Sequence, residues 1–582
     1  MTGKGVTMEN ATQGLAALIS PRSVAVIGAS SDPTRIGGRP IAYYLQGGFE
    51  GALYPVNPAR KDVQGVPAFP DLDAIPGAVD FALLAIPAAA IPEAIDACGR
   101  KGVRAVLIFS AGFAEIGTEG AALQAEIMAR ARSHGIRVLG PNCLGLFNAH
   151  IGHCPTFTSA LQDGNMPAGR VGLITQSGAY GTHLLNMARA RRIGVGIWIS
   201  TGNEADVTVP GCMEYLIESG EVDAIGCYME AVNDRDTFLR ALDKARRARK
   251  PVTIMKVGTS EIGAEAAQSH TASLVGSDES FNAALHRFGA QRAATTEEML
   301  DMLYAASLSP LPRGRKLGIL TVSGGAGVLM ADAAAVEGLS VPPMPEDAQQ
   351  ALLRSNPLSS PRNPIDVTAH ALNDFGIVSD SLTAMCEQGG YDMIAAFFTS
   401  WTASPVLGPR IRDAVRDGLK GQTTKPFAMV CQAGTDMLAS YEADGLMIFE
   451  DPSRAIRALS RLARFAEAFF DQDGEPQELP DIGADAMLPG EAVGEHEAKR
   501  ILARAGIAVL PEELAPDPSA AAHAAARIGF PVAMKIASPD IPHKTEVGGV
   551  ALNLGDMEAV ERAAEAMLAS VAGKAPDARI EG

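Results

Sequence analysis

Several common protein features are missing from this 582-residue sequence, and each absence narrows its classification. Its seven cysteines include no C-x-x-C pair and are odd in number, which indicates neither a zinc knuckle nor a disulfide framework. Basic residues are scarce: 49 Lys and Arg against 67 Asp and Glu give a net charge of −18, which argues against nucleic acid or an anionic membrane as the main partner. No apolar run is long enough to span a bilayer and no signal-peptide pattern opens the sequence, so we expect a cytoplasmic protein.

Apolar strand-like runs alternate with alanine-rich helical stretches along most of the chain. This alternation predicts α/β domains with parallel, doubly wound sheets, and the length predicts about three to five of them. The pattern begins at Ser23–Gly28 and restarts at Val171–Thr175 and at Lys316–Val322, with similar openings at the two restarts. An acidic, proline-containing stretch from about 470 to 490 is typical of a linker. In the last piece, Ile507–Leu510 is predicted as a strand.

The first strand-like run leads into a glycine turn, Gly28-Ala-Ser-Ser-Asp-Pro-Thr-Arg-Ile-Gly37-Gly38. This turn is not a G-x-G-x-x-G fingerprint, but its backbone amides could still bind a phosphate at the end of a strand. A tight turn that simply needs small residues is the structural alternative. Asn57-Pro58 and Ile86-Pro87 end the next strands at the same edge, which favours a nucleotide-like ligand lying across it.

His270 lies among glycine, alanine and hydroxyl residues between Lys256 and Gly276. Most histidines are satisfied structural residues, but these small neighbours suit an exposed nucleophile better than a core. Two turns, Thr175-Gln-Ser-Gly178 and Ser323-Gly-Gly-Ala-Gly327, each join a strand-like run to a helical one. Their N-terminal amides and helix dipoles could hold a phosphorylated imidazole. Glu230 ends a strand and could orient the ring, although a solvated strand end is an equal alternative.

In the last piece, Lys535 ends a strand-like run before a polar, glycine-containing loop. A nucleoside triphosphate would fit such a loop, and so would an ordinary surface turn.

The motifs resemble those of the nucleoside-diphosphate-forming acyl-CoA synthetases, relatives of succinyl-CoA synthetase, in their fused single-chain form. The resemblance extends over essentially the whole chain. The motifs that carry it are Val-Ile-Gly-Ala-Ser30, Tyr-Pro-Val-Asn-Pro58, Ser-Ala-Gly-Phe-Ala-Glu115, Gly-Pro-Asn-Cys-Leu-Gly145, Gln-Ser-Gly178, Gly-Asn-Glu-Ala-Asp206, Ser-His-Thr-Ala-Ser-Leu-Val-Gly276 and His-Lys-Thr-Glu-Val-Gly-Gly-Val550.

The resemblance implies a CoA-binding Rossmann-like domain (15–145), a flavodoxin-like succinyl-CoA-ligase domain (165–308), a second flavodoxin-like domain (315–470) and the first part of an ATP-grasp domain (488–582). It implies that His270 is the phosphohistidine, that Glu230 is its carboxylate partner and that Lys535, with His543, lies near ATP. The predicted phosphate-binding residues are Thr175, Ser177, Gly178, Ser323, Gly324, Gly325 and Ala326. With Asn57 added from the strand ends, the predicted CoA-binding residues are Gly28, Ala29, Ser30, Asn57, Arg60, Ile86 and Pro87.

The expected function is ligation of a carboxylic acid to CoA, with ATP converted to ADP and phosphate through an acyl phosphate and a phosphohistidine. The family resemblance implies that the ATP-grasp domain and its Mg²⁺-binding carboxylates continue beyond residue 582, so we expect a truncated chain or a fragment. We also expect a homodimer. The sequence does not name the acid. Two alternatives stay open: a nicotinamide-dependent dehydrogenase and a CoA-sensing regulatory protein.

Overall fold

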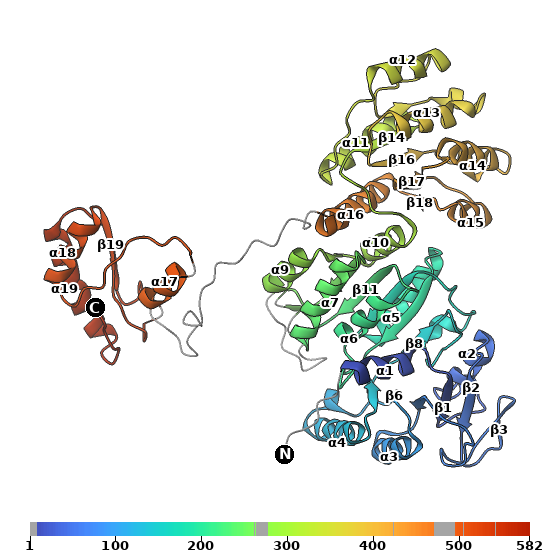
Figure 1. Cartoon of the computed structure of the whole chain (residues 1–582), viewed down its shortest axis with the longest axis horizontal. Coiled ribbons are helices and arrows are strands. Elements are labelled where there is room, and N and C mark those ends of the chain that lie inside the picture. Colours follow the sequence, from blue (N-terminus) through green and yellow to red (C-terminus); the bar gives the residue numbers. More distant parts are fainter. Residues whose placement is uncertain are drawn as a thin grey trace. The chain divides into compact units, whose positions relative to one another are not determined.

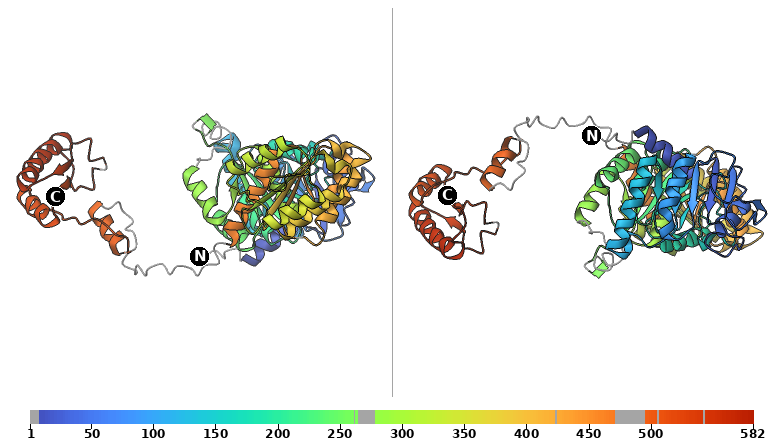
Figure 2. Two further views of the ribbon diagram at one scale, coloured as in Figure 1. Left: turned by 90° about the horizontal axis from the view of Figure 1, so that it is seen from above. Right: turned by 90° about the horizontal axis from the view of Figure 1, so that it is seen from below.

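The computed structural model describes residues 8–260, 262–263, 278–422, 424–470, 495–504, 506–541 and 543–582, and for residues 8–13 it describes the backbone alone. The chain divides into two compact units, Met1–Asp473 and Gly474–Gly582. Three separate sheets of five or six strands follow one another through the first unit, and helices flank the strands of each (Figures 1 and 2).

The first sheet is parallel throughout. Its strands, in sheet order, are β2 (Ala52–Val56), β1 (Ser23–Ile27), β5 (Phe81–Leu84), β6 (Ala105–Ile108) and β7 (Arg137–Leu139). Because side chains alternate along a strand, Val24 and Val26 enter one core while Ala25 enters another. Its helices are α1 (Met8–Ile19), α2 (Arg39–Gly47), α3 (Ile91–Lys101) and α4 (Thr118–His134), and a small hairpin is formed by β3 (Asp62–Val63) and β4 (Val66–Pro67).

The second sheet is parallel except for β8, which pairs antiparallel with β10 at one edge. Its strands, in sheet order, are β13 (Gln291–Arg292), β12 (Val252–Lys256), β11 (Ala224–Met229), β9 (Val171–Thr175), β10 (Val195–Ser200) and β8 (Gly145–Asn148). Its helices are α5 (Gly178–Ala190), α6 (Val209–Glu218), α7 (Arg235–Arg247), α9 (Asp278–Phe288) and α10 (Thr296–Leu308).

The third sheet is parallel, and its strands, in sheet order, are β15 (Ile365–Asp366), β14 (Leu317–Thr321), β16 (Met393–Phe397), β17 (Phe427–Val430) and β18 (Met447–Phe449). Its helices are α11 (Gly324–Val336), α12 (Glu346–Ser355), α13 (Gly376–Glu387), α14 (Leu407–Gly418), α15 (Thr435–Ala443) and α16 (Pro452–Phe470). In chain order, the parallel strands of the second and third sheets are arranged identically: the first strand lies between the second and the third, and the fourth and fifth follow outward. The similarity expected for these two segments is confirmed.

Neighbouring sheets share their hydrophobic cores. Buried residues of the first and second sheets, such as Val26 and Ile254, belong to one contiguous cluster. A second cluster joins the second and third sheets, because α10 and α16 pack against each other between them (Figure 1). Ion pairs border this helix contact, including Arg454 with Asp301 at 2.6 Å. The limits of the three predicted domains stay predictions: the first and third sheets each have a cluster of their own, but other clusters run across the boundaries between neighbouring sheets.

The second unit is a small α/β piece. Its elements are α17 (Glu495–Arg504), α18 (Pro518–Ile528), β19 (Val532–Lys535), β20 (Val550–Leu554) and α19 (Met557–Lys574). The two strands pair antiparallel with each other. The strand predicted at Ile507–Leu510 is wrong: these residues form neither a helix nor a strand, they pair with no strand in the described part of the unit, and Leu510 is 81% exposed. The apolar run there had no neighbouring strand edge to join.

All seven cysteines are free and buried. Burial raises the pKa of several of these thiols, that of Cys98 to about 12, so they stay protonated and unreactive in the folded chain. None of the helices in the described ranges combines the length and the apolar character needed to cross a membrane.

Candidate active site

The residues predicted to bind CoA meet at one edge of the first sheet. Gly28 follows β1, Asn57 follows β2, and Ile86 and Pro87 follow β5, and parallel strands bring their carboxyl ends to the same edge. Gly28 has φ = +88°, and a Cβ there would overlap with the carbonyl oxygen of Ala85. The turn therefore requires glycine for its conformation and for its close packing.

The amides of this turn are already used inside the protein. Gly28 and Ala29 both donate to the carbonyl of Val56, and Ser30 donates to the carbonyl of Gly37. The side chain of Asn57 donates to the carbonyl of Ala29 at 2.8 Å and accepts from Ala59. These amides therefore have partners inside the protein, and their binding of a phosphate stays a prediction. Arg60 and Pro87 are exposed at the same edge and accessible to a ligand.

The first predicted phosphate turn joins β9 to α5. Ser177 is the N-cap of α5, and its hydroxyl accepts from the amide of Tyr180 at 3.4 Å. A side chain at Gly178 would overlap with Leu144. Thr175 is fully buried, and its hydroxyl accepts from the indole nitrogen of Trp198 at 3.2 Å. Ser177 and Gly178 thus lie where a helix N-terminus can meet an anion, whereas the side chain of Thr175 supports the sheet.

Gln176 lies between Thr175 and Ser177 and was not singled out from the sequence. Its side chain makes several hydrogen bonds. Its side-chain oxygen accepts from the amides of Glu230 and Ala231, and its side-chain nitrogen donates to the carbonyl of Ala231 and to Glu204. Gln176 therefore connects the phosphate turn to the strand end that carries Glu230. In the sequence, only its position inside the Thr-Gln-Ser-Gly motif pointed to Gln176, and the motif alone does not reveal these hydrogen-bond partners.

Glu204 is a second functional candidate that the sequence did not reveal. The residue is 9% exposed, and its carboxylate accepts from Gln176 and Asn233, each at 3.0 Å, and from Thr201 and the amide of Val209. Burial raises its pKa, and these four donors act in the opposite direction. The resulting cluster fixes the segment that follows β11.

Glu230 lies directly after β11, at the same edge of the second sheet as the Ser177 turn. It is half-buried, and its carboxylate contributes, after burial itself, to raising the pKa of Tyr228 to about 12. The predicted phosphohistidine, His270, lies outside the described residues. The pairing of Glu230 with His270 therefore stays a prediction.

The second predicted phosphate turn joins β14 to α11 on the third sheet. Ser323 is the N-cap of α11, and its amide donates to the hydroxyl of Thr321. Gly324 and Gly325 are exposed, and a Cβ at Gly325 would meet nothing within 4 Å. Together with Ala326 they form an accessible first helical turn. That this turn and the Ser177 turn hold one phosphate stays a prediction.

In the second unit, Lys535 ends β19 and donates to the carboxylate of Glu495 at 2.7 Å. Lys544 lies 3.6 Å from the other oxygen of Glu495, next to the exposed His543. The predicted ATP-binding residues Lys535 and His543 therefore border one patch of lysines around a single carboxylate.

Comparison with known proteins places the chain in a family. Residues 22–149 match the model of a CoA binding domain, 168–306 that of a succinyl-CoA ligase like flavodoxin domain, and 489–582 that of an ATP-grasp domain. An ADP-forming acetate–CoA ligase of Archaeoglobus fulgidus is 34% identical over 578 residues, which are 97% of this chain and 81% of the relative. The chain belongs to the ADP-forming acid–CoA ligases.

Other members of the family support this assignment. A trans-feruloyl-CoA synthase from an unknown prokaryote is 33% identical over 92% of this chain and 76% of its own length. An acetyl-coenzyme A synthetase of Ca. Korarchaeum cryptofilum, solved with phosphate and ADP, has a TM-score of 0.71 and 30% identity over 78% of this chain and 98% of its own. The chain is therefore an enzyme, and none of these relatives supports the dehydrogenase or the CoA-sensing alternative.

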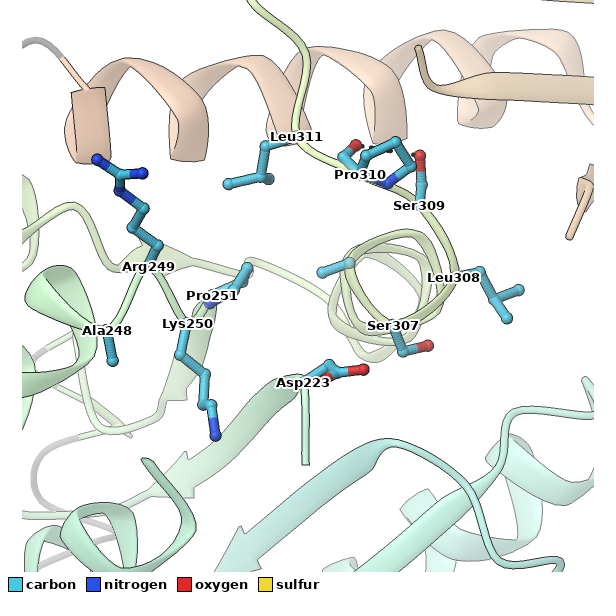
Figure 3. Close-up of a pocket in the computed structure, with 11 residues that line it drawn as sticks. Asp223, Ala248, Arg249, Lys250, Pro251, Ser307, Leu308, Ser309, Pro310 and Leu311 are labelled. Atoms are coloured by element: carbon cyan, nitrogen blue, oxygen red, sulfur yellow. Dashed lines mark hydrogen bonds between the residues drawn. The ribbon is translucent and has the colours of Figure 1, made fainter. Parts of the chain in front are cut away.

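A cavity of about 410 Å³ in this ligase lies at the amino ends of β11 and β12, opposite the edge that carries the predicted site (Figure 3). Its polar groups already have partners. Lys250 donates to the carbonyls of Leu216 and Ser219, Asp223 pairs with Arg170, and Arg249 lies over the ring of Phe470. This cavity therefore offers no free charge to a substrate.

The lysine patch of the second unit predicts a pH effect. The hydrogen bond from Lys535, followed by that from Lys499, holds the pKa of Glu495 at about 2. A carboxylate with a lowered pKa stabilises the fold above its ordinary pKa of about 4.3, and the contribution is lost as the pH falls towards 2. We expect Lys535→Met to raise the pKa of Glu495, as measured by NMR titration of its carboxyl carbon. Arg562→Met, far from Glu495 in sequence and paired with Glu558, is the control and should leave that pKa unchanged.

Proposed function

We propose that this protein joins a carboxylic acid to CoA while ATP is converted to ADP and phosphate. The observation that carries the proposal is the similarity to an ADP-forming acetate–CoA ligase over 97% of the chain. Matches to CoA-binding, succinyl-CoA-ligase-like and ATP-grasp domains occur together in this chain, and the proposed reaction uses all three.

In the proposed sequence of steps, the imidazole of His270 takes the γ-phosphoryl group of ATP and ADP leaves. The carboxylate of the acid then takes the phosphoryl group from His270, which gives an acyl phosphate. The CoA thiolate attacks the acyl carbon, the thioester forms and inorganic phosphate leaves. Covalent transfer through a histidine divides one difficult step into easier ones. Phosphoryl transfer depends mainly on positioning and charge stabilisation, to which helix N-termini are suited.

In this proposal the described residues bind and orient. The first turn of α5, from Ser177, and the first turn of α11, from Ser323, supply amides for the phosphoryl oxygens. Glu230 orients the imidazole, and Gln176 holds Glu230 in place through its backbone amide. The exposed edge of the first sheet, with Arg60 and Pro87, takes CoA.

The identity of the acid and the surroundings of the reaction belong to the proposal too. Mg²⁺ is expected to accompany ATP, but in the described ranges no group of three or more His, Cys, Asp or Glu side chains could hold a metal ion, so no step is assigned to it. Seven free, buried thiols support a reducing compartment such as the cytoplasm. The expected homodimer can be checked by sedimentation.

A panel of acids tests the function. The relatives named above act on acetate and on ferulate, so the panel should run from short aliphatic acids to hydroxycinnamates. We expect the full-length protein to form thioester and ADP in equal amounts with at least one acid. Formation of AMP instead of ADP, or binding of a nicotinamide dinucleotide in place of CoA, would contradict the proposal.

A further inference from the structure

A second cavity, of about 680 Å³, lies at the carboxyl ends of β12 and β13, beside the first turns of α5 and α10. It is on the same edge of the second sheet as Ser177 and Glu230, and Tyr180, three residues after the N-cap Ser177, contributes to its wall. Ligands of open α/β sheets bind at this edge. The volume is in the range of pockets that bind small organic molecules.

Lys256, the last residue of β12, is among the residues that line this cavity, and its charged side chain is buried. Its side chain is 3% exposed, and its ammonium group has no hydrogen-bond partner among the described residues. An ammonium group carries three donors, and burying it without an acceptor is costly. Burial accordingly lowers the pKa of Lys256.

The nearest carboxylate does not satisfy Lys256. Asp278 Oδ1 lies 3.9 Å from the ammonium nitrogen, too far for a hydrogen bond. Both oxygens of Asp278 instead accept from the guanidinium of Arg292, at 2.7 and 3.0 Å. The ring of Phe281 lies 5.6 Å from the ammonium and provides no lone pair. The single carboxylate of Asp278 therefore lies near two cations and accepts hydrogen bonds from Arg292 alone. The ammonium group of Lys256 is left without a hydrogen-bond acceptor among the described residues.

The remaining wall suits an organic anion. Met255, Val257 and Ala293 supply apolar surface, while the hydroxyls of Tyr180 and Thr296 hydrogen-bond each other at its border. A buried cation combined with an apolar wall matches a carboxylate that carries a hydrocarbon tail. In a chain with a net charge of −18, such a positive site is a local exception.

We propose that this cavity binds the carboxylate of the organic acid substrate and that Lys256 is the residue that holds it. The inference rests on the proposed function, since it names a substrate site for that reaction. Lys256 would recognise an oxyanion, and inorganic phosphate presents an oxyanion as a carboxylate does. The cavity adjoins the Ser177 turn, so an acid bound there lies beside the residues predicted to hold the phosphoryl group.

The test is a binding measurement on the whole chain without nucleotide or CoA. Ligand-observed NMR titrations use acetate, benzoate and inorganic phosphate in separate arms. We expect Lys256→Met to weaken carboxylate binding about tenfold or more, because a charge-assisted hydrogen bond is lost, and Lys256→Arg to restore much of it. Lys250→Met is the matched control: Lys250 is at the opposite edge of the sheet and donates to two carbonyls, so its loss should leave acid binding unchanged.

Thermal unfolding separates this role from a structural one. Removing an unsatisfied buried charge should leave the melting temperature of Lys256→Met unchanged or raised, whereas a lysine needed to pair Asp278 would lower it. Equal acid binding by the parent and Lys256→Met would overturn the inference. Binding of phosphate but no carboxylate, still dependent on Lys256, would support the oxyanion site and identify phosphate as its ligand.

CoA binding, measured calorimetrically on the same samples, separates a failure of the acid site from a failure of the proposed ligase function. Acid binding that depends on Lys256, with no CoA binding, would contradict the proposed function and leave this site standing. CoA binding with no oxyanion bound in any arm would overturn this site alone.

Discussion

Replacing His270 with alanine should abolish the phosphoenzyme and reduce thioester formation by a factor on the order of 10⁴ or more, as expected when a covalent nucleophile is removed. Incubation of the full-length protein with γ-labelled ATP should give an acid-labile, base-stable phosphoenzyme, which is the behaviour of a phosphoramidate. The variant should still bind CoA, because the predicted CoA edge lies on another sheet.

Two further variants sharpen this result. His286→Ala is the matched control, since His286 is an exposed histidine in the last turn of α9 and should retain full labelling. Glu230→Gln should reduce labelling less than the loss of His270, as expected for an orienting group. Label that persists in His270→Ala, with thioester formation intact, would refute the phosphohistidine mechanism.

The second large effect is expected at Gln176. A glutamate there keeps the size of the side chain but cannot donate to Glu204 or to the carbonyl of Ala231, and it places two carboxylates in contact. We expect Gln176→Glu to lower the free energy of unfolding by about 2 kcal/mol and to reduce phosphoenzyme formation more than a hundredfold, since the segment carrying Glu230 loses its anchor.

Gln64→Glu provides the matched comparison on the first sheet. The amide of Gln64 donates to the carbonyls of Ser30 and Gly38, so its loss should disturb the glycine turn there. This variant should weaken CoA binding and leave phosphoenzyme formation near the parent level. If Gln176→Glu forms phosphoenzyme at the parent rate, Gln176 does not position the site.

The architecture could be predicted from the sequence where short apolar runs and the turns after them identify the strands. Apolar runs such as Val171–Thr175 and Val252–Met255 are buried strands, and the small residues after them form turns at one sheet edge, because a parallel sheet leaves few other arrangements. The prediction at Ile507–Leu510 was wrong for the complementary reason. A strand needs a partner edge, and composition alone does not show whether one is present.

The candidate site was predicted less completely. Gln176, Glu204 and Asn233 come from three loops that follow different strands, and their contacts exist only once β9, β10 and β11 are side by side. Glu204 also has φ = +56°, a backbone conformation that glutamate rarely adopts and that cannot be predicted from its sequence neighbours. The charge excess at Lys256 likewise depends on Arg292, 36 positions away, occupying both oxygens of Asp278.

The hydrophobic clusters shared between neighbouring sheets bear on how the first unit responds to ligands. Val26 and Ile254 lie in one cluster, and Leu173 and Ile319 lie in another, so one sheet cannot melt without exposing the core of the next. Unfolding of one sheet is then coupled to the stability of its neighbour. A ligand that binds only the folded state raises the free energy of unfolding of every part that unfolds together with its site. CoA bound at the first sheet would thereby also help to protect the neighbouring sheets from heat and from proteases.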